Sequence, residues 1–372
     1  MIHIGKPYIF NNKDKSRLIA VINIDNQETE CFFEVDKKYE KYLTTEVADA
    51  FVIGLLHRAM TLGYDIESKA PVSESVLYGL ENFLIPNLCF ADTNMKHIKI
   101  LADVTDSPKS VGAVGTGCSL GIDSFEAMHE NINTKFVKHN LTHLCLFNAG
   151  AFYNGEENFW NMIPKVQKVA DAFNLPLITG HSNIHTIIFG DYQITHTFYS
   201  LFCVFALRKL FGVYYYASAY PLYKFSCMNN TLIGNDTAKY DLLTFHCLSD
   251  SNLLLYSAGS GKKTRIEKTQ VIMDDKIVQE NLDVCVQHKE TNCGDCSKCN
   301  RTMLQLYFLG RLKKFKKVFP VEHFYKNKKS YIEWMEQNKD KSLLEKETYD
   351  YYIQHNKETI FNKMKNIFKQ KR

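Results

Sequence analysis

The chain has 372 residues, of which 45 % are hydrophobic and 13 % aromatic, enough for one large or two medium packed domains. Its formal net charge is +4, and the lysine-rich stretches after residue 310 are typical of solvated helical faces. The sequence contains no recognisable nucleic-acid-binding motif, and so small an excess of positive charge predicts no nucleic-acid partner. The N-terminus lacks the layout of a signal peptide, and no run approaches the roughly 18 apolar residues of a membrane span. We therefore expect a cytoplasmic protein with no membrane partner.

The first 108 residues are expected to form a separate α+β domain. Their short alternating runs and single helical stripes carry no obvious chemistry. In chain order the sequence predicts a hairpin of strands 16–25 and 30–35 with a turn around Asn26, a helix from Asp49 to Gly63, a helix over 76–84 with Ser73 as its N-cap, and a strand over 97–104.

Residues 109–280 alternate between strand and helix patterns, which predicts βαβ crossovers and a doubly wound parallel sheet. In such sheets ligands bind beyond the carboxyl ends of the strands. The expected elements are strands 111–117, 144–147, 177–179 and 213–219, with helices over 123–132, 159–173 and 197–210. Residues 281–372 are expected to form a cysteine knot followed by a basic helical tail.

The first turn from strand to helix in this domain is rich in small residues, from Gly115 to Ser124. Small residues let the backbone pass close to a polyphosphate, and the amides of such a turn point at the anion. The hydroxyls of Ser119 and Ser124 can donate to phosphate oxygens, while Asp123 would hold Mg²⁺ or brace the loop. No Gly-Lys-Ser/Thr follows, so this is not a Walker loop, and the spacing does not fit a dinucleotide fingerprint.

Four of the eleven cysteines crowd into 15 residues, Cys285, Cys293, Cys296 and Cys299. Clustering at two-residue gaps in a large chain predicts metal binding, not a disulfide framework. Four thiolates that converge on one ion form a closed tetrahedral Zn²⁺ site, which is structural because no position is left for water. An iron–sulfur cluster stays open as the alternative.

Two of these motifs resemble one family. Ser119-Leu120-Gly121-Ile122-Asp123-Ser124 is similar to the Ser-Gly-Gly-x-Asp-Ser loop of the PP-loop ATP pyrophosphatase superfamily, with Leu120 where glycine is usual. The knot, followed by Arg301, resembles the zinc motif of the 7-cyano-7-deazaguanine synthase-like family within it. The resemblance implies a PP-loop fold, the cofactors ATP, Mg²⁺ and Zn²⁺, and nucleotide contacts from Gly117, Ser119, Gly121, Asp123 and Ser124.

The resemblance also implies an activity: an AMP-forming ligase adenylates a carboxylate or amide oxygen, releases pyrophosphate and lets a nitrogen nucleophile attack. Asp123, Ser124 and Arg265 would be its catalytic residues. The substrate would be a small acid or a partner protein, as in relatives from bacterial defence clusters, and homo-oligomerisation is left open. The alternatives are a tRNA-modifying sulfurtransferase and a non-catalytic nucleotide sensor.

Three further segments have both a functional and a plain interpretation. The cationic turn 259–265 would close on the pyrophosphate or is merely solvated. His181 and Asn183, in the segment expected after the third strand, contact substrate or cap the next segment of the chain. Cys118 lacks an obvious base and is interpreted as packing, and Tyr214, Tyr215 and Tyr216 as mostly core.

Overall fold

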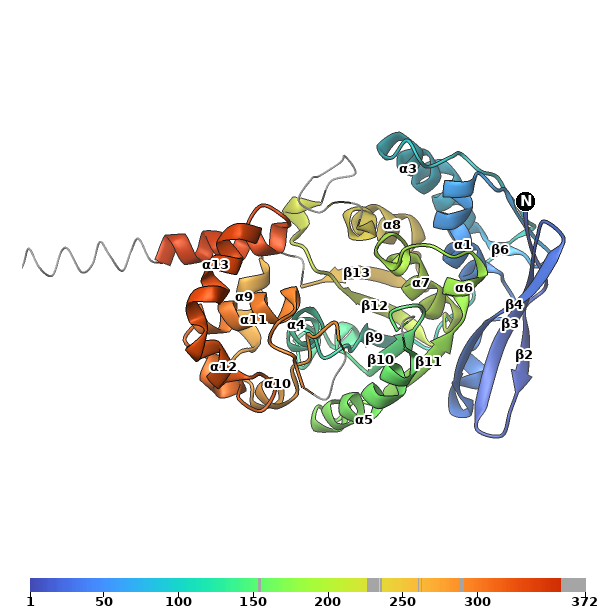
Figure 1. Cartoon of the computed structure of the whole chain (residues 1–372). Helices are drawn as coiled ribbons and strands as arrows, with labels where there is room; N and C mark the ends of the chain where they lie inside the picture. The colour runs from blue at the N-terminus through green and yellow to red at the C-terminus, as the bar shows by residue number, and fades with distance from the viewer. Residues whose placement is uncertain are drawn as a thin grey trace, which may run out of the picture. The chain divides into compact units, whose positions relative to one another are not determined.

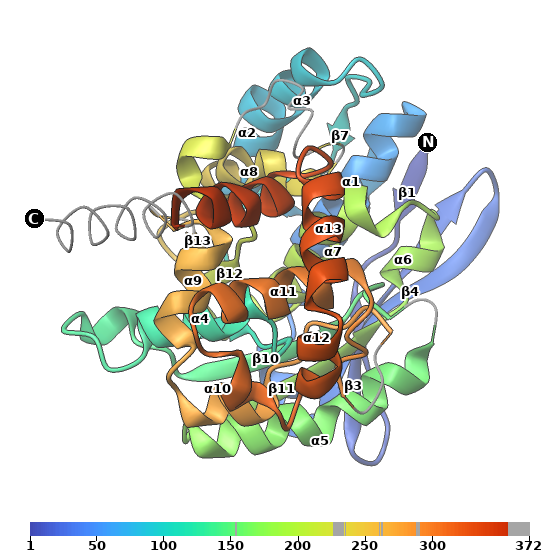
Figure 2. The ribbon, with the colours of Figure 1, turned by 60° about the vertical axis from the view of Figure 1, so that its left-hand side comes forward.

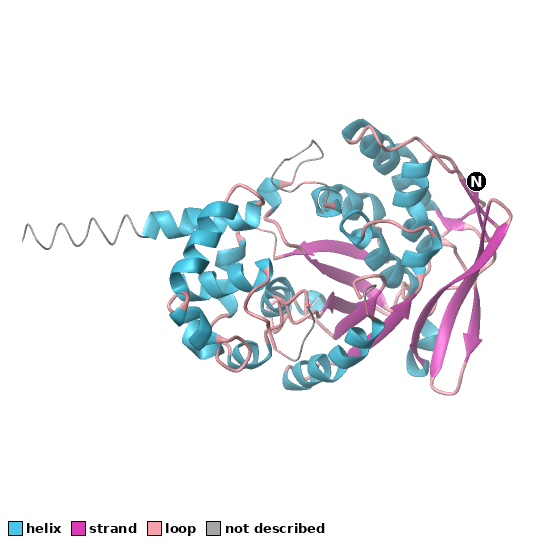
Figure 3. Cartoon of the chain, in the orientation of Figure 1, coloured by secondary structure: helices cyan, strands magenta, loops and turns pink. Residues whose placement is uncertain are grey.

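The chain is an α/β protein, and its computed structural model describes residues 1–152, 155–225, 234, 236–259, 261, 263–287 and 291–355. The fold divides into two compact units. We call the first the sheet unit, made of residues 1–119, 127–229 and 235–261, and the second the knot unit, made of residues 120–126, 230–234 and 262–372. Every assigned strand belongs to the sheet unit, and Figure 3 shows these strands in magenta.

Five parallel strands form the core of the sheet unit, in the spatial order β13-β12-β9-β10-β11. Numbered along the chain this order reads 5-4-1-2-3, so the winding direction reverses between β9 and β12. The prediction of a parallel sheet in an α/β fold is confirmed for these five strands. The strands are β9 (Ala113–Gly117), β10 (His143–Asn148), β11 (Leu177–Ser182), β12 (Phe211–Ala217) and β13 (Leu254–Ala258), the last of which the sequence reading missed.

The N-terminal hairpin continues the same sheet. β3 (Lys15–Ile24) and β4 (Gln27–Asp36) are joined by Asp25 and Asn26, whose φ values of 52° and 67° suit a two-residue hairpin turn. β4 pairs antiparallel with β11, as Figure 1 shows beside the parallel strands. The remaining strands are β1 (Ile2–Ile4), β2 (Tyr8–Asn11), β5 (Ile66–Ser68) and β7 (Ile100–Leu101), with β6 (Val72–Ser73) and β8 (Val104–Thr105) as a separate pair.

Helices cover both faces of the sheet. α1 (Asp49–Leu62) ends at Gly63 as predicted and packs against α7 (Tyr192–Ala206). The ring of Phe202 on α7 meets Phe51 of α1 and Phe33 of β4 edge-on, at centroid distances of 5.4 and 6.2 Å. α5 (Glu156–Ala172) packs on β10 and β11 from the opposite face (Figure 1). The sheet unit also contains α6 (Ile184–Ile187), α8 (Asp241–Leu248) and the short turns Lys37–Tyr42, Val137–His139, Leu222–Lys224 and Thr237–Tyr240.

The helix predicted over 76–84 is wrong at both ends. α2 (Glu74–Gly79) continues through a π-helical turn, Leu80–Leu84, into α3 (Ile85–Ala91). Pro86 does not end the helix, because it lies in the first turn of α3, where a missing N–H is tolerated. Ser73 is the N-cap residue, as predicted, but its hydroxyl donates to Asp49 Oδ2 at 2.6 Å and makes no capping hydrogen bond to the helix.

Other boundaries also differ from the prediction. The strand predicted over 97–104 shrinks to the two-residue strands β7 and β8. α7 begins at Tyr192, five residues before the predicted start, because the Asp191 side chain caps it by accepting from Gln193 N at 2.9 Å. β11 extends to Ser182, because its last three residues pair with β4.

The knot unit is helical. α11 (Ser297–Phe308) packs against α9 (Arg265–Ile272) and α13 (Lys328–Asn338), and α12 (Val321–Lys326) packs against α13, as Figure 2 shows. α10 (Lys276–Asn281), the turn Leu312–Phe315 and a helical stretch over 343–355 complete it. α4 (Ile122–Asn131) starts in this unit. Among the described residues, no helix has the length and apolarity needed to cross a bilayer.

Candidate functional site

The phosphate loop predicted from the sequence joins the carboxyl end of β9 to the start of α4. The loop backbone is anchored by Cys118 N, which donates to Cys145 O on β10 at 2.7 Å. β9 has β10 on one side and β12 on the other, so the winding of the sheet reverses beside it. Open α/β sheets bind their ligands at this reversal, outside the carboxyl ends of the strands.

Leu120, the residue that departs from the family pattern, has a left-handed backbone with φ 58°. For an L-residue with a Cβ this conformation costs about 1–2 kcal/mol, which is why glycine is usual in such loops. The Leu120 side chain is completely buried, and its carbonyl accepts from Asp283 N at 2.9 Å. The chain thus keeps the backbone path that glycine favours and holds it by packing.

The two loop hydroxyls lie in different surroundings. Ser119 is exposed, whereas Ser124 is buried and its Oγ donates to Gly121 O at 3.0 Å. Gly117 is open on the side where a side chain would project: the nearest atom to a Cβ there would be Tyr214 Oη at 3.7 Å. Ser119 is therefore the exposed residue of the loop, and Gly117 and Gly121 are partly exposed.

Asp123, in the first turn of α4, forms ion pairs with two cations of α9. Its Oδ2 lies 2.9 Å from Arg265 Nη2, and its Oδ1 lies 3.2 Å from Lys268 Nζ. Lys268 is fully buried and was missed from the sequence, although it stands one helical turn after Arg265 on the same helix face. Both carboxylate oxygens of Asp123 are thus engaged by cations.

Arg265, expected at the end of the cationic turn 259–265, is the first residue of α9. Thr264 caps this helix in a reciprocal capping box with Glu267. The buried Arg265 Nε has no hydrogen-bond partner among the described residues. Ser260 and Lys262, from the cationic turn 259–265, lie outside the described residues, and Lys263 pairs with Glu126 at 2.6 Å.

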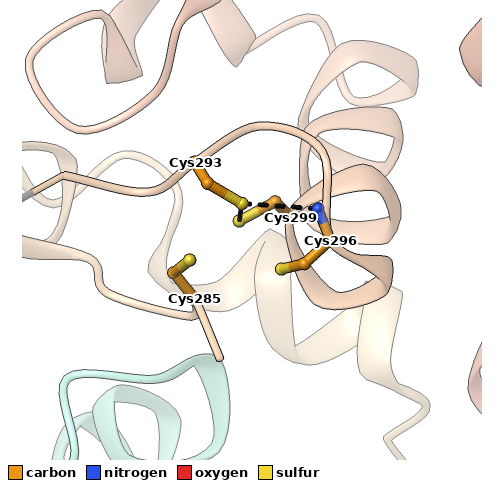
Figure 4. Close-up of side chains that lie close together, drawn as sticks. All are labelled: Cys285, Cys293, Cys296 and Cys299. Carbon is orange, nitrogen blue, oxygen red and sulfur yellow. Dashed lines mark hydrogen bonds between the residues drawn. The ribbon is translucent and has the colours of Figure 1, made fainter. Parts of the chain in front are cut away.

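The four knot cysteines converge on one point (Figure 4). Their sulfur atoms all lie within 4.8 Å of one another, and Cys293 and Cys299 Sγ are 3.9 Å apart. A tetrahedral ion with metal–sulfur bonds of about 2.3 Å would separate its ligands by about 3.8 Å, whereas a disulfide needs about 2.05 Å. The cluster can therefore hold one metal ion, and it is the one group with such geometry within the described ranges.

Local backbone geometry positions these thiols. Gly294 has φ 83°, and a Cβ there would lie 2.5 Å from Pro320 Cγ, so this position requires glycine. The turn aims the amides of Asp295 and Cys296 at Cys293 Sγ, both at 3.4 Å. Against the effect of burial, these hydrogen bonds lower the pKa of the Cys293 thiol to about 7. These amides thus favour the thiolate form of Cys293.

Asn292 ties the knot to its surroundings and was missed from the sequence. Its buried side chain accepts from Val284 N at 2.8 Å and donates to the carbonyls of Leu282 and Val318 at 2.8 and 3.0 Å. These bonds join the segment that carries Cys285 to the one that carries the other three cysteines. An asparagine beside a cysteine is too common for its sequence position to have revealed this role.

His181 and Asn183 belong to the junction of β11 with β4. His181 lies within β11, and its Nε2 is 3.6 Å from Glu156 Oε1. Asn183 accepts from Phe32 N at 2.8 Å and donates to Glu30 O at 2.7 Å, while Ser182 Oγ accepts from Ile184 N. The expectation that His181 caps the next segment is wrong, because His181 is a strand residue; Asn183 stands at the N-cap position of α6, and the side-chain hydrogen bond to Ile184 N comes from Ser182. Cys118 is buried with its Sγ 4.0 Å from Met128 Sδ, as expected for packing.

Comparison of the chain with protein-family models, curated proteins and solved structures produced no match.

Proposed function

We propose that this protein is an AMP-forming, ATP-dependent ligase of the PP-loop ATP pyrophosphatase kind. The observation that carries the proposal is the position of the loop Gly117–Ser124. It follows β9, the first of the five parallel strands along the chain, beside the point where the winding of the sheet reverses. A glycine- and serine-rich loop that runs into a helix N-terminus at that point suits the phosphates of a nucleotide.

The side chains around the loop support the same interpretation. Ser119 is accessible for a phosphate oxygen, whereas Ser124 stabilises the loop through Gly121 O. Asp123 holds Arg265 and Lys268 at the start of α4, so its role is to brace two cations. Because both of its oxygens already contact cations, Mg²⁺ would arrive with the phosphates of ATP and not on Asp123. Arg265, whose buried Nε has no hydrogen-bond partner in the part of the chain that the structure describes, is the cation that we assign to a phosphate oxygen.

In the reaction proposed, a substrate oxygen attacks the α-phosphorus of ATP, and the bond to the β-phosphate oxygen breaks with release of pyrophosphate. AMP then leaves the activated carbon when a nitrogen nucleophile attacks it. A free carboxylate oxygen is a poor leaving group. Once that oxygen is bonded to the phosphorus of AMP, it departs readily as part of AMP. Cations and amides preorganised at the loop stabilise the charge that develops on the departing pyrophosphate. The acid is a small molecule or a group on a partner protein.

We further propose that the ion in the knot is Zn²⁺ with a structural role. The set of four thiolates suits zinc and leaves no position for water. Sulfur atoms within 4.8 Å of one another fit a single ion, because an iron–sulfur cluster would place several atoms between the thiolates and spread them further.

The other candidate functions receive less support. Sulfur transfer needs a reactive thiol at the loop, and Cys118 is buried against Met128. A nucleotide sensor that binds ATP without turnover would be favoured by a distorted loop. The backbone at Leu120, however, keeps the left-handed path that glycine would take.

The test is the identity of the bond cut in ATP. Purified protein with ATP, Mg²⁺, ammonium chloride and a panel of ¹⁸O-labelled carboxylates, among them a deazapurine carboxylate, should yield AMP and pyrophosphate, with the label in AMP. Asp123→Asn should abolish this while Asp171→Asn, an exposed control on α5, should not. Production of ADP and phosphate would refute the assignment. Tight ATP binding without turnover of any acid would favour the sensor.

A further inference from the structure

A second polar group lies at the same edge of the sheet, at the end of β12. Tyr215 pairs with Thr116 of β9, so Tyr216 stands level with Gly117, where the phosphate loop begins. Tyr214 and Tyr215 are buried, whereas Tyr216 is partly exposed. From the sequence, all three tyrosines were expected to be mostly core. The last of them instead reaches the edge where a ligand of this sheet is expected.

Tyr216 belongs to a chain of three hydrogen-bonded side chains. Its Oη lies 2.7 Å from His196 Nδ1 on α7, and His196 Nε2 lies 2.8 Å from Asp236 Oδ1. Asp236 also accepts from Ala238 N at 2.9 Å and from Gln193 Nε2 at 3.3 Å. These residues come from separate segments of the sheet unit, 20 and 40 positions apart.

The charge on Asp236 determines which atoms donate and which accept in these hydrogen bonds. Burial would raise the pKa of Asp236, but the hydrogen bond and charge of His196 outweigh it and lower that pKa. An ionised Asp236 accepts from Nε2–H, and in the neutral form of the His196 ring this hydrogen bond selects the tautomer in which Nδ1 is the acceptor. Burial raises the pKa of Tyr216, so its phenol is protonated and donates to Nδ1. A carboxylate that orients a histidine, which in turn accepts from a hydroxyl, is the arrangement that lets a hydroxyl pass a proton on.

We propose that Tyr216 is the catalytic group that takes the proton of the nitrogen nucleophile, with His196 and Asp236 as positioning residues. This inference rests on the proposed function and concerns its second step. As the nitrogen lone pair forms the bond to the activated carbon, the N–H proton passes to Tyr216 Oη, and the Tyr216 proton passes to His196 Nδ1. The bond to AMP breaks with its electron pair, and the imidazolium beside Asp236 later releases its proton to water.

A neighbouring polar pair adjoins this group, with Thr197 Oγ1 3.4 Å from His196 Nδ1. Thr197 Oγ1 donates to Asp241 Oδ1 at 2.8 Å, and both residues are buried. The Tyr216 chain is different, because the side chains of His196 and Asp236 are 14 % and 13 % exposed and so can exchange protons with solvent. The titratable and charged groups that face His196 from the surrounding elements are Asp236, Asp241, Tyr192, Tyr216, His57 and Lys239.

The experiment separates the two half-reactions. Exchange of labelled pyrophosphate into ATP in the presence of the acid panel reports adenylation alone, and product formation with ammonium chloride reports the complete reaction. Tyr216→Phe should leave the exchange rate within about twofold and lower product formation by roughly 100-fold. Hydroxylamine, which is largely unprotonated at neutral pH and needs little base assistance, should restore most of the rate.

His196→Gln should lower product formation and remove the limb of the pH–rate profile that reports the base, again with exchange preserved. Tyr214→Phe, two residues earlier on the same strand face, is the matched control and should behave as wild type. Equal losses in both half-reactions, or no loss in Tyr216→Phe, would overturn the role of Tyr216. Absence of exchange in the wild type with every acid would overturn the proposed function instead, and the role of Tyr216 with it.

Discussion

Leu120 offers a sharp test of how the loop is held, because its backbone conformation lowers the stability of the folded state and its buried side chain raises it. Its φ of 58° is strained by about 1–2 kcal/mol in any residue with a Cβ. Its side chain is fully buried, and truncation of such a leucine costs about 2–5 kcal/mol. Leu120→Ala keeps the strain and loses the burial. Leu120→Gly also loses the burial but relieves the strain, at a cost of about 0.5–1 kcal/mol in unfolded-chain entropy.

We therefore expect both variants to be destabilised, with Leu120→Gly more stable than Leu120→Ala by about 0.5–1 kcal/mol. At an ordinary position the order is reversed, and Ala127→Gly inside α4 is the control that should show this. The free energy of unfolding is measured by urea denaturation with zinc in the buffer, and the midpoints are compared at equal slope. If Leu120→Ala proved as stable as Leu120→Gly or more so, the left-handed backbone at this position would be refuted.

Three further predictions concern the knot and a buried acid. Elemental analysis should find one zinc per chain. Cys296→Ser should lose the metal and fold poorly, whereas Cys89→Ser outside the knot should retain it; iron with visible absorbance would contradict the zinc assignment. Asn292→Ala removes three buried hydrogen bonds and should cost roughly 2–4 kcal/mol, against about 0.5 or less for exposed Asn82→Ala. Burial raises the pKa of Asp241 to about 7, so the folded state binds a proton that the unfolded state has lost. Stability should therefore fall as the pH rises from about 4 to about 7, and Asp241→Asn, which can still accept from Thr197, should flatten that dependence in denaturation midpoints. An unchanged slope in this variant would show that another group is responsible.

Local patterns in the sequence were sufficient for several features. Two-residue gaps bring the thiols of Cys293, Cys296 and Cys299 together through local backbone geometry, so most of the metal cluster could be predicted, whereas the place of Cys285 also depends on the contacts of Asn292. The turn at Asp25 and Asn26 and the glycine after α1 depend on backbone preferences of single residues, and both predictions are confirmed. The alternation of strand and helix patterns predicted a largely parallel sheet. The predicted domain boundaries at residues 108 and 280 stay predictions.

Only the tertiary structure decided which distant groups meet. Lys268 reaches Asp123 across 145 positions, and His196 joins Tyr216 to Asp236 from another segment. The hydrophobic period of a helix reports which face is buried, but it contains no information on the partner in that contact. The order of strands, and with it the reversal beside β9, depends on how crossovers pack on the two faces of the sheet. The loop could be recognised from its residues, but its neighbours could not, because long-range packing alone brings them to it.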